Sequence, residues 1–107
     1  MKIKRVTEDE IIFDNGNIIT YYHEQSCCEC NYAEFSVLNE NNIYYDHDFD
    51  AELQFEFVEE EGFTFGDETA KIFIPCYSDQ NGYYSTGIEI LYNGKRVLYG
   101  HCEERFY

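Results

Sequence analysis

The 107-residue sequence contains no tryptophan, one proline and seven glycines. This scarcity of proline and glycine argues against a long linker or a low-complexity segment. No apolar run approaches the roughly 18 residues that a membrane-spanning helix needs, so we expect no transmembrane helix. The basic start Met1–Arg5 has no apolar segment behind it. We therefore predict a cytoplasmic protein without a signal peptide.

Positive charge is also scarce. Seven Lys and Arg oppose 22 Asp and Glu, for a formal net charge of -15. Between Val6 and Ala70 there are eighteen carboxylates and no Lys or Arg. Such a surface repels nucleic acids and anionic membranes and attracts basic protein surfaces. The alternative is that the charge serves only solubility.

Aromatic residues make up 19% of the chain, as 11 Tyr and 9 Phe. Together with Ile and Val they favour strands, and the length suits one domain, residues 1–107. We predict a mostly β fold, or α+β with one short helix. About six strands in antiparallel hairpins would form a small sheet, a sandwich or a partly open barrel.

The first hairpin is predicted at Asn15-Gly16, between two runs rich in β-branched and aromatic residues. Asn-Gly readily adopts the positive φ angles of a two-residue type I′ turn. Such a turn would place Phe13 opposite Ile18 and Ile12 opposite Ile19.

The second hairpin is predicted at Asn93-Gly94, by the same reasoning. A two-residue turn there would pair Ile90 with Val97 and Ile88 with Tyr99 on one core-facing side.

Three other segments carry local signals. Asn31 can cap a short helix over Tyr32–Leu38, although an extended conformation fits nearly as well. The period-two pattern of residues 53–57 predicts a half-buried strand. Ala70–Tyr77 is predicted as a strand in which Pro75 indicates an edge or a bulge.

Two unusual stretches, His23–Cys30 and Cys76–Ser85, hold four of the five cysteines. They resemble the two motifs of a family of small uncharacterised proteins, a domain of unknown function common in bacteriophages and prophages. The residues that carry the resemblance are His23, Gln25, Cys27, Cys28 and Glu29, followed by Asn81, Gly82, Tyr83, Tyr84 and Ser85. Ser26 stands where the family usually has Asp. The resemblance implies a mobile-element origin, a bacterial host cytosol and a mostly β fold, but no activity.

A metal site is one use for the first stretch. Cys27 and Cys30 have the spacing of a zinc knuckle, and His23 is close in sequence. A second knuckle is missing, although Cys76 and the His101-Cys102 pair can converge on the first. An odd number of cysteines also excludes a complete disulfide framework. Because free cysteine commonly packs as a small hydrophobe, we expect no cofactor, with zinc as the alternative.

An enzyme is a weaker interpretation. His23 can activate Cys27 or Cys28 as a nucleophile, but neighbouring carboxylates disfavour a thiolate. We predict a non-enzymatic protein in which the two stretches are mainly fold-defining and pack together.

The segment Asp46–Asp50 has carboxylates at alternate positions, as at the start of a calcium-binding EF-hand loop. Ala51 replaces the required glycine and Phe57 the required glutamate. A solvated acidic loop is the better account.

The acidic surface itself is the preferred functional feature. It would bind a basic host protein, as a nucleic-acid mimic or an inhibitor. The predicted binding face comprises Asp46, Asp48, Asp50, Glu52, Glu59, Glu60 and Glu61. The alternative is a metal- or small-ligand-binding protein that uses Cys27, Cys28 and the Asn81–Ser85 hairpin. The oligomeric state stays open, a homodimer included.

Overall fold

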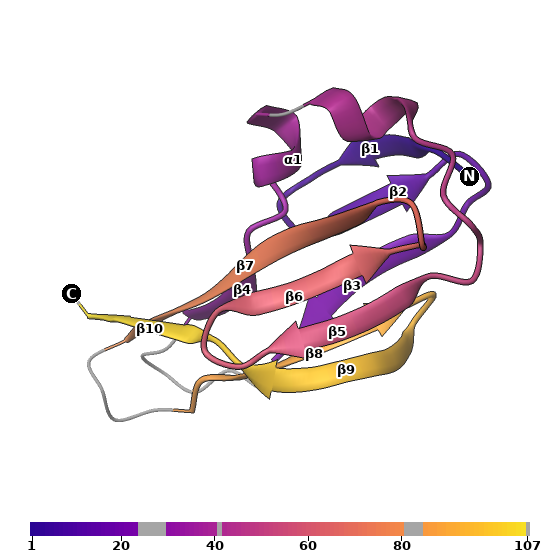
Figure 1. Ribbon diagram of the computed structural model, residues 1–107. Coiled ribbons are helices and arrows are strands. Elements are labelled where there is room, and N and C mark those ends of the chain that lie inside the picture. The colour runs from indigo at the N-terminus through magenta and orange to yellow at the C-terminus, as the bar shows by residue number, and fades with distance from the viewer. Residues whose placement is uncertain (24–29, 41, 81–84, 107) are drawn as a thin grey trace.

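The computed structural model describes residues 1–23, 30–40, 42–80 and 85–106, and it shows two five-stranded sheets that face each other (Figure 1). The first sheet has the order β1 (Ile3–Val6), β2 (Glu10–Phe13), β3 (Ile18–Tyr22), β8 (Gly87–Tyr92) and β9 (Lys95–His101). The second has the order β10 (Glu103–Phe106), β7 (Lys71–Gln80), β6 (Gly62–Gly66) and β5 (Gln54–Val58), and β4 (Cys30–Ala33) also pairs with β7. The predicted mostly β class is confirmed, and the described residues form ten strands in place of about six.

Two short helical segments, α1 (Val37–Glu40) and the 3-10 helix η1 (Asn42–Asp46), connect β4 with β5. Pairing is antiparallel throughout except between β7 and β10, which run parallel. No helix among the described residues is long and apolar enough to span a membrane.

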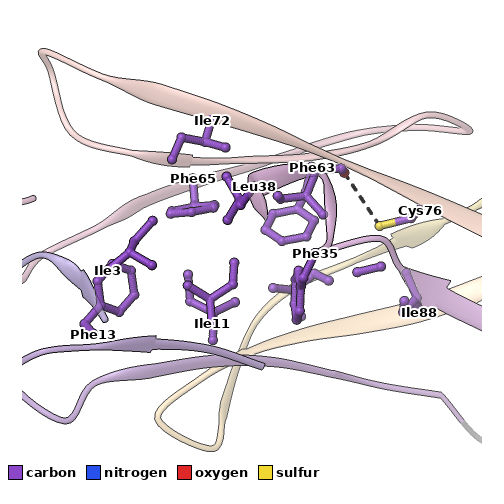
Figure 2. Packing of buried hydrophobic residues seen from close by; sticks show 14 of the residues in the cluster. Ile3, Ile11, Phe13, Phe35, Leu38, Phe63, Phe65, Ile72, Cys76 and Ile88 are labelled. Carbon is purple, nitrogen blue, oxygen red and sulfur yellow. Dashed lines mark hydrogen bonds between the residues drawn. The ribbon is translucent and has the colours of Figure 1, made fainter. Parts of the chain in front are cut away.

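The core lies between the two sheets. Figure 2 shows Ile11 and Phe13 of the first sheet pointing toward Phe65 and Ile72 of the second. All four are at most 2% exposed. Each such side chain contributes about 1.5–3 kcal/mol by leaving water, so this inner face holds the sheets together.

The first hairpin has a different register from the predicted one. Ile12, not Phe13, pairs with Ile18, and Ile11 pairs with Ile19. The Phe13 amide donates to the Asn17 carbonyl, so the loop has three residues. Gly16 has φ of 92°, whereas Asn15 keeps negative φ, which excludes a type I′ turn. The shift places Ile11 and Ile19 together in the core.

The second hairpin has the predicted turn but not the predicted register. Asn93 and Gly94 both have positive φ, 52° and 82°, as a type I′ turn requires. A β-bulge between Ile90 and Leu91 then shifts the pairing, so Ile90 faces Leu98. Val97 is consequently left at the surface, 37% exposed.

The helix predicted over Tyr32–Leu38 is wrong. Asn31 lies inside β4 instead of capping a helix, and the helical turn begins only at Val37. The alternative extended conformation holds for Tyr32 and Ala33, because pairing with β7 supplies their backbone hydrogen bonds.

The strand expectations for the middle of the chain are confirmed. Residues 54–58 form β5, in which Phe55 and Phe57 alternate with exposed polar residues. Pro75 lies within the long β7, which pairs with β6 over residues 71–75 and gains β4 as a second partner only from Cys76. Proline therefore lies where β7 is still an edge on one side.

Gly62 allows the close approach of β6 to β7. Its φ is 155°, and an added Cβ would lie 2.1 Å from the Ile74 carbonyl oxygen. We expect Gly62→Ala to lower the free energy of unfolding by about 3 kcal/mol or more, because strain and a backbone clash coincide. Gly16→Ala is the matched control, since it meets open space and incurs only about 1–2 kcal/mol of conformational strain. Urea titrations measure the free energy of unfolding of both variants. Equal losses of stability would contradict a backbone clash at Gly62.

Candidate binding surfaces

The seven carboxylates predicted as one binding face form two groups at opposite ends of β5. Asp46, Asp48, Asp50 and Glu52 precede the strand, whereas Glu59–Glu61 form the turn after it. All seven are exposed. A five-residue strand spans about 17 Å, so each group has its own surroundings.

The first group, except for Asp46, lines an open hollow of about 740 Å³. Five carboxylates line it and no Lys or Arg does; they are Asp48, Asp50, Glu52, Asp67 and Glu68. We call these residues the acidic hollow. Asp67 and Glu68 were not among the predicted residues. They join the hollow because Gln54 pairs with Gly66, which places the β6–β7 turn beside the start of β5.

Asp67 holds two walls of the acidic hollow together. Its Oδ1 accepts hydrogen bonds from the Thr69 amide and the Ala70 amide, both at 2.9 Å. Its Oδ2 accepts one from His47 Nε2 at 3.0 Å and one from the Asp50 amide at 3.3 Å. The His47 and Thr69 hydrogen bonds hold the pKa of Asp67 well below its usual range. Asp67 is thus a structural carboxylate, and few of its lone pairs remain available to accept further hydrogen bonds.

Asp48 is held in a similar way. The amino group of Met1 donates to Asp48 Oδ1 at 2.6 Å and to the Phe49 carbonyl at 2.7 Å. The ammonium hydrogen bond lowers the pKa of Asp48. The carboxylates of Glu52 and Glu68 are exposed, and Asp50 uses one oxygen to accept the Glu52 amide at 3.1 Å. The side chains best placed to meet a partner are therefore Asp50, Glu52 and Glu68.

The second group lies beside the C-terminal strand. Glu59 Oε2 is 3.2 Å from the amide nitrogen and 3.2 Å from the ring Nδ1 of His101. Glu60 has φ of 64°, and it lines a smaller hollow of about 400 Å³ together with Glu103 and Glu104. Negative charge therefore gathers at both ends of the sandwich.

Most motif residues lie outside the described residues: Gln25, Cys27, Cys28, Glu29, Asn81, Gly82, Tyr83 and Tyr84. His23 and Ser85 are described, and both contact Asn31, which belongs to a buried polar network. Asn31 Nδ2 donates to the Ser85 carbonyl at 3.0 Å and to the Gly87 carbonyl at 2.9 Å. The Asn31 amide lies 3.4 Å from His23 Nε2. The flanks of both stretches thus meet, as far as they are described.

The network continues into β7. Ser78 donates to Asn31 Oδ1, and Gln80 Nε2 donates to Ser78 Oγ at 2.6 Å. Asn31, Ser78 and Gln80 are at most 2% exposed. Since His23 Nε2 accepts a hydrogen bond, its proton lies on Nδ1. That nitrogen is buried without a hydrogen-bond partner, the one such side-chain atom in the described part of the chain. A buried donor without an acceptor costs about 1–3 kcal/mol.

The described cysteines have contrasting environments. Cys30 is exposed, whereas Cys76 and Cys102 are buried. The Cys102 thiol and burial together raise the pKa of Cys76 far above its usual range. The described residues contain no group of three or more His, Cys, Asp or Glu suited to a metal ion. Cys27, the remaining zinc candidate, lies outside the described residues.

The family comparison covers most of this architecture. A family model described as a domain of unknown function, DUF7448, matches residues 1–90. The chain belongs to the DUF7448 family. The matched range includes both motif stretches and the whole acidic hollow, and it ends within β8. No curated protein and no solved structure matched this DUF7448 member.

The lowered pKa of Asp67 predicts how the folding stability of this DUF7448 member changes at acidic pH. Its folded pKa is lowered, so its charge stabilises the fold above the unfolded pKa of about 4, and this contribution is lost as pH falls below that value. We expect Asp67→Asn to lower the urea midpoint of unfolding at pH 7. The difference in midpoint between the variant and wild type should become smaller below about pH 4. Glu68→Gln, in the same turn and exposed, is the control and should change little. A difference in urea midpoint that stays constant from pH 2 to 7 would contradict a stabilising role for the charge of Asp67.

Thiol reactivity tests the cysteine environments. Cys30 should react readily with a thiol reagent in the native protein, because it is exposed. Cys76 and Cys102 should react at least about a hundredfold more slowly, since their modification requires opening of the core. Peptide mapping by mass spectrometry assigns the modification to each residue, with urea-unfolded protein as the control. Equal native rates for Cys30 and Cys76 would refute the described packing.

Proposed function

We propose that this protein is a non-enzymatic binding protein that recognises a basic protein partner through the acidic hollow. The observation that carries the proposal is the convergence of five carboxylates, with no Lys or Arg, on one concave surface. A basic side chain entering a hollow is surrounded by acceptors and partly desolvated, which strengthens each ion pair relative to one on a flat surface.

The charge distribution supports a specific surface over general solubility. Asp48 and Asp67 are held in place by the Met1 amino group, His47 and backbone amides. These two structural carboxylates fix the walls of the acidic hollow, and their charges add to the negative potential of the surface that Asp50, Glu52 and Glu68 present. A phage or mobile-element origin and action in the host cytosol belong to the same proposal, with inhibition of a nucleic-acid-binding protein as the kind of role that such a mimic serves.

Charge reversal within the acidic hollow tests the proposal. The variant Asp50→Lys, Glu52→Lys, Glu68→Lys avoids the two structural carboxylates. We expect it to weaken binding of a basic partner, captured from bacterial lysate and then purified, by about a hundredfold or more. Isothermal titration calorimetry at two salt concentrations measures this loss.

The matched control is Glu59→Lys, Glu60→Lys, Glu61→Lys, which makes the same change in net charge at the other end of β5. It should retain most of the affinity, and circular dichroism should show both variants folded. Equal losses of affinity in the two variants would mean that the partner responds only to net charge, which would contradict a specific site. Unchanged affinity in the hollow variant would overturn the proposal.

A second candidate is binding of a metal or small ligand near His23. The observation that favours a small ligand is the buried Nδ1–H without an acceptor beside the Asn31–Ser78–Gln80 network, because an acceptor group of the ligand would satisfy it. A metal ion would require this nitrogen to lose its proton. Native mass spectrometry of protein purified from cytosol, compared with the denatured mass, distinguishes the candidates. An added mass that persists in the native spectrum favours this second candidate, whereas a bare mass favours the acidic hollow.

A further inference from the structure

A third hollow lies where the end of β3 meets β4. Its volume is about 340 Å³. The residues that matter for its chemistry are Glu8, Asp9, Tyr21, Cys30, Tyr32 and Glu34. We call it the tyrosine pocket. Three aromatic residues line it, against Phe49 alone in the acidic hollow, and Phe35 packs edge-on against Tyr21 with ring centroids 5.8 Å apart. The pocket is thus a concave surface with packed aromatic side chains as well as carboxylates.

The three carboxylates of the tyrosine pocket come from two sides. Glu8 and Asp9 lie on the β1–β2 turn, and Glu34 follows β4. The Tyr21 hydroxyl lies 3.4 Å from Asp9 Oδ1. Burial, with the charges of Asp9, Cys30 and Glu8, raises the pKa of Tyr21 to about 12. The pocket therefore favours positive charge, and its phenol stays neutral at physiological pH.

The chain already binds one of its own cations with this chemistry in the second sheet, which supplies the β4 wall of the pocket. The Arg105 guanidinium lies 3.9 Å from the Tyr77 ring centroid, and its Nε is 3.2 Å from Asp79. Tyr77 pairs directly with Tyr32 across β7 and β4. Arg105 also donates to the Tyr32 hydroxyl, but its charge is balanced by Asp79. Aromatic faces beside carboxylates are therefore cation sites in this fold.

We propose that the tyrosine pocket receives a lysine side chain of the basic partner. An ammonium group directs three N–H donors in different directions, which suits acceptors on two sides of a pocket. A guanidinium prefers the planar, two-point contact that one carboxylate offers. The apolar stem of lysine can pack along the Tyr21 ring. This inference rests on the proposed function, because it names the side chain that the partner supplies.

Nuclear magnetic resonance titration of the full chain with Nα-acetyl-lysine amide at constant ionic strength tests the pocket without a partner. We expect saturable shifts of the Tyr21, Cys30, Tyr32 and Ala33 signals. The ε-acetylated lysine derivative, which lacks the charge, should not produce them. The arginine derivative should bind more weakly, and cadaverine serves as the free diamine.

Two matched variants locate the effect. Glu8→Gln, Asp9→Asn, Glu34→Gln removes three charges from the tyrosine pocket, and Asp50→Asn, Glu52→Gln, Glu68→Gln removes three from the acidic hollow. The pocket variant should weaken lysine binding about tenfold or more, a change of about 1.4 kcal/mol or more, and the hollow variant should leave it nearly unchanged. Glu8→Lys, at an exposed position, places a competing ammonium at the pocket and provides a second test if the triple variant fails to fold.

Equal weakening in the two triple variants would overturn the inference, since it would reduce the binding to net charge. Cadaverine binding more than tenfold tighter than the lysine derivative would assign the pocket to a free diamine and overturn it too. Failure here is distinguishable from failure of the proposed function. The lysine titration needs no partner, and the charge-reversal experiment on the acidic hollow does not alter the tyrosine pocket.

Discussion

Burial of Phe49 between the two sheets is the constraint on which the acidic surface depends. Its ring contacts Phe13 of the first sheet and Phe65 of the second, each with centroids 6.0 Å apart. His47 packs edge-on against Phe49 at 4.4 Å. Because neighbours in an extended segment point to opposite sides, burying Phe49 turns Asp48 and Asp50 outward. A core contact thus orients the carboxylates.

Hydrogen bonds reduce the electrostatic cost of gathering these charges. Asp67 and Asp48 accept from backbone amides, His47 and the Met1 amino group, and both pKa values are lowered. Their ionised forms therefore stabilise the fold at neutral pH, whereas the side chains of Glu52 and Glu68 are exposed to solvent. The division between structural and available carboxylates lets one acidic segment serve both stability and the proposed binding.

The two ends of the sandwich differ in kind. One end presents the acidic hollow, whereas the buried network of Asn31, Ser78 and Gln80 lies beside the ends of both motif stretches. A buried polar network is stable only when its members are satisfied. The unpaired His23 Nδ1 is the exception in the described residues.

Local composition and residue periodicity are enough to predict the β class, the positions of both Asn-Gly turns, a strand at residues 53–57 and the excess of negative charge. The hairpin registers depend on the tertiary structure, since a three-residue loop and the bulge at Ile90 and Leu91 follow from which side chains enter the core. The grouping of carboxylates on the surface depends on it too. Asp67 and Glu68 join Asp50 through the pairing of β5 with β6, and Glu34 joins Glu8 across two sheets. Such proximity depends on contacts between distant segments, which residue spacing does not encode.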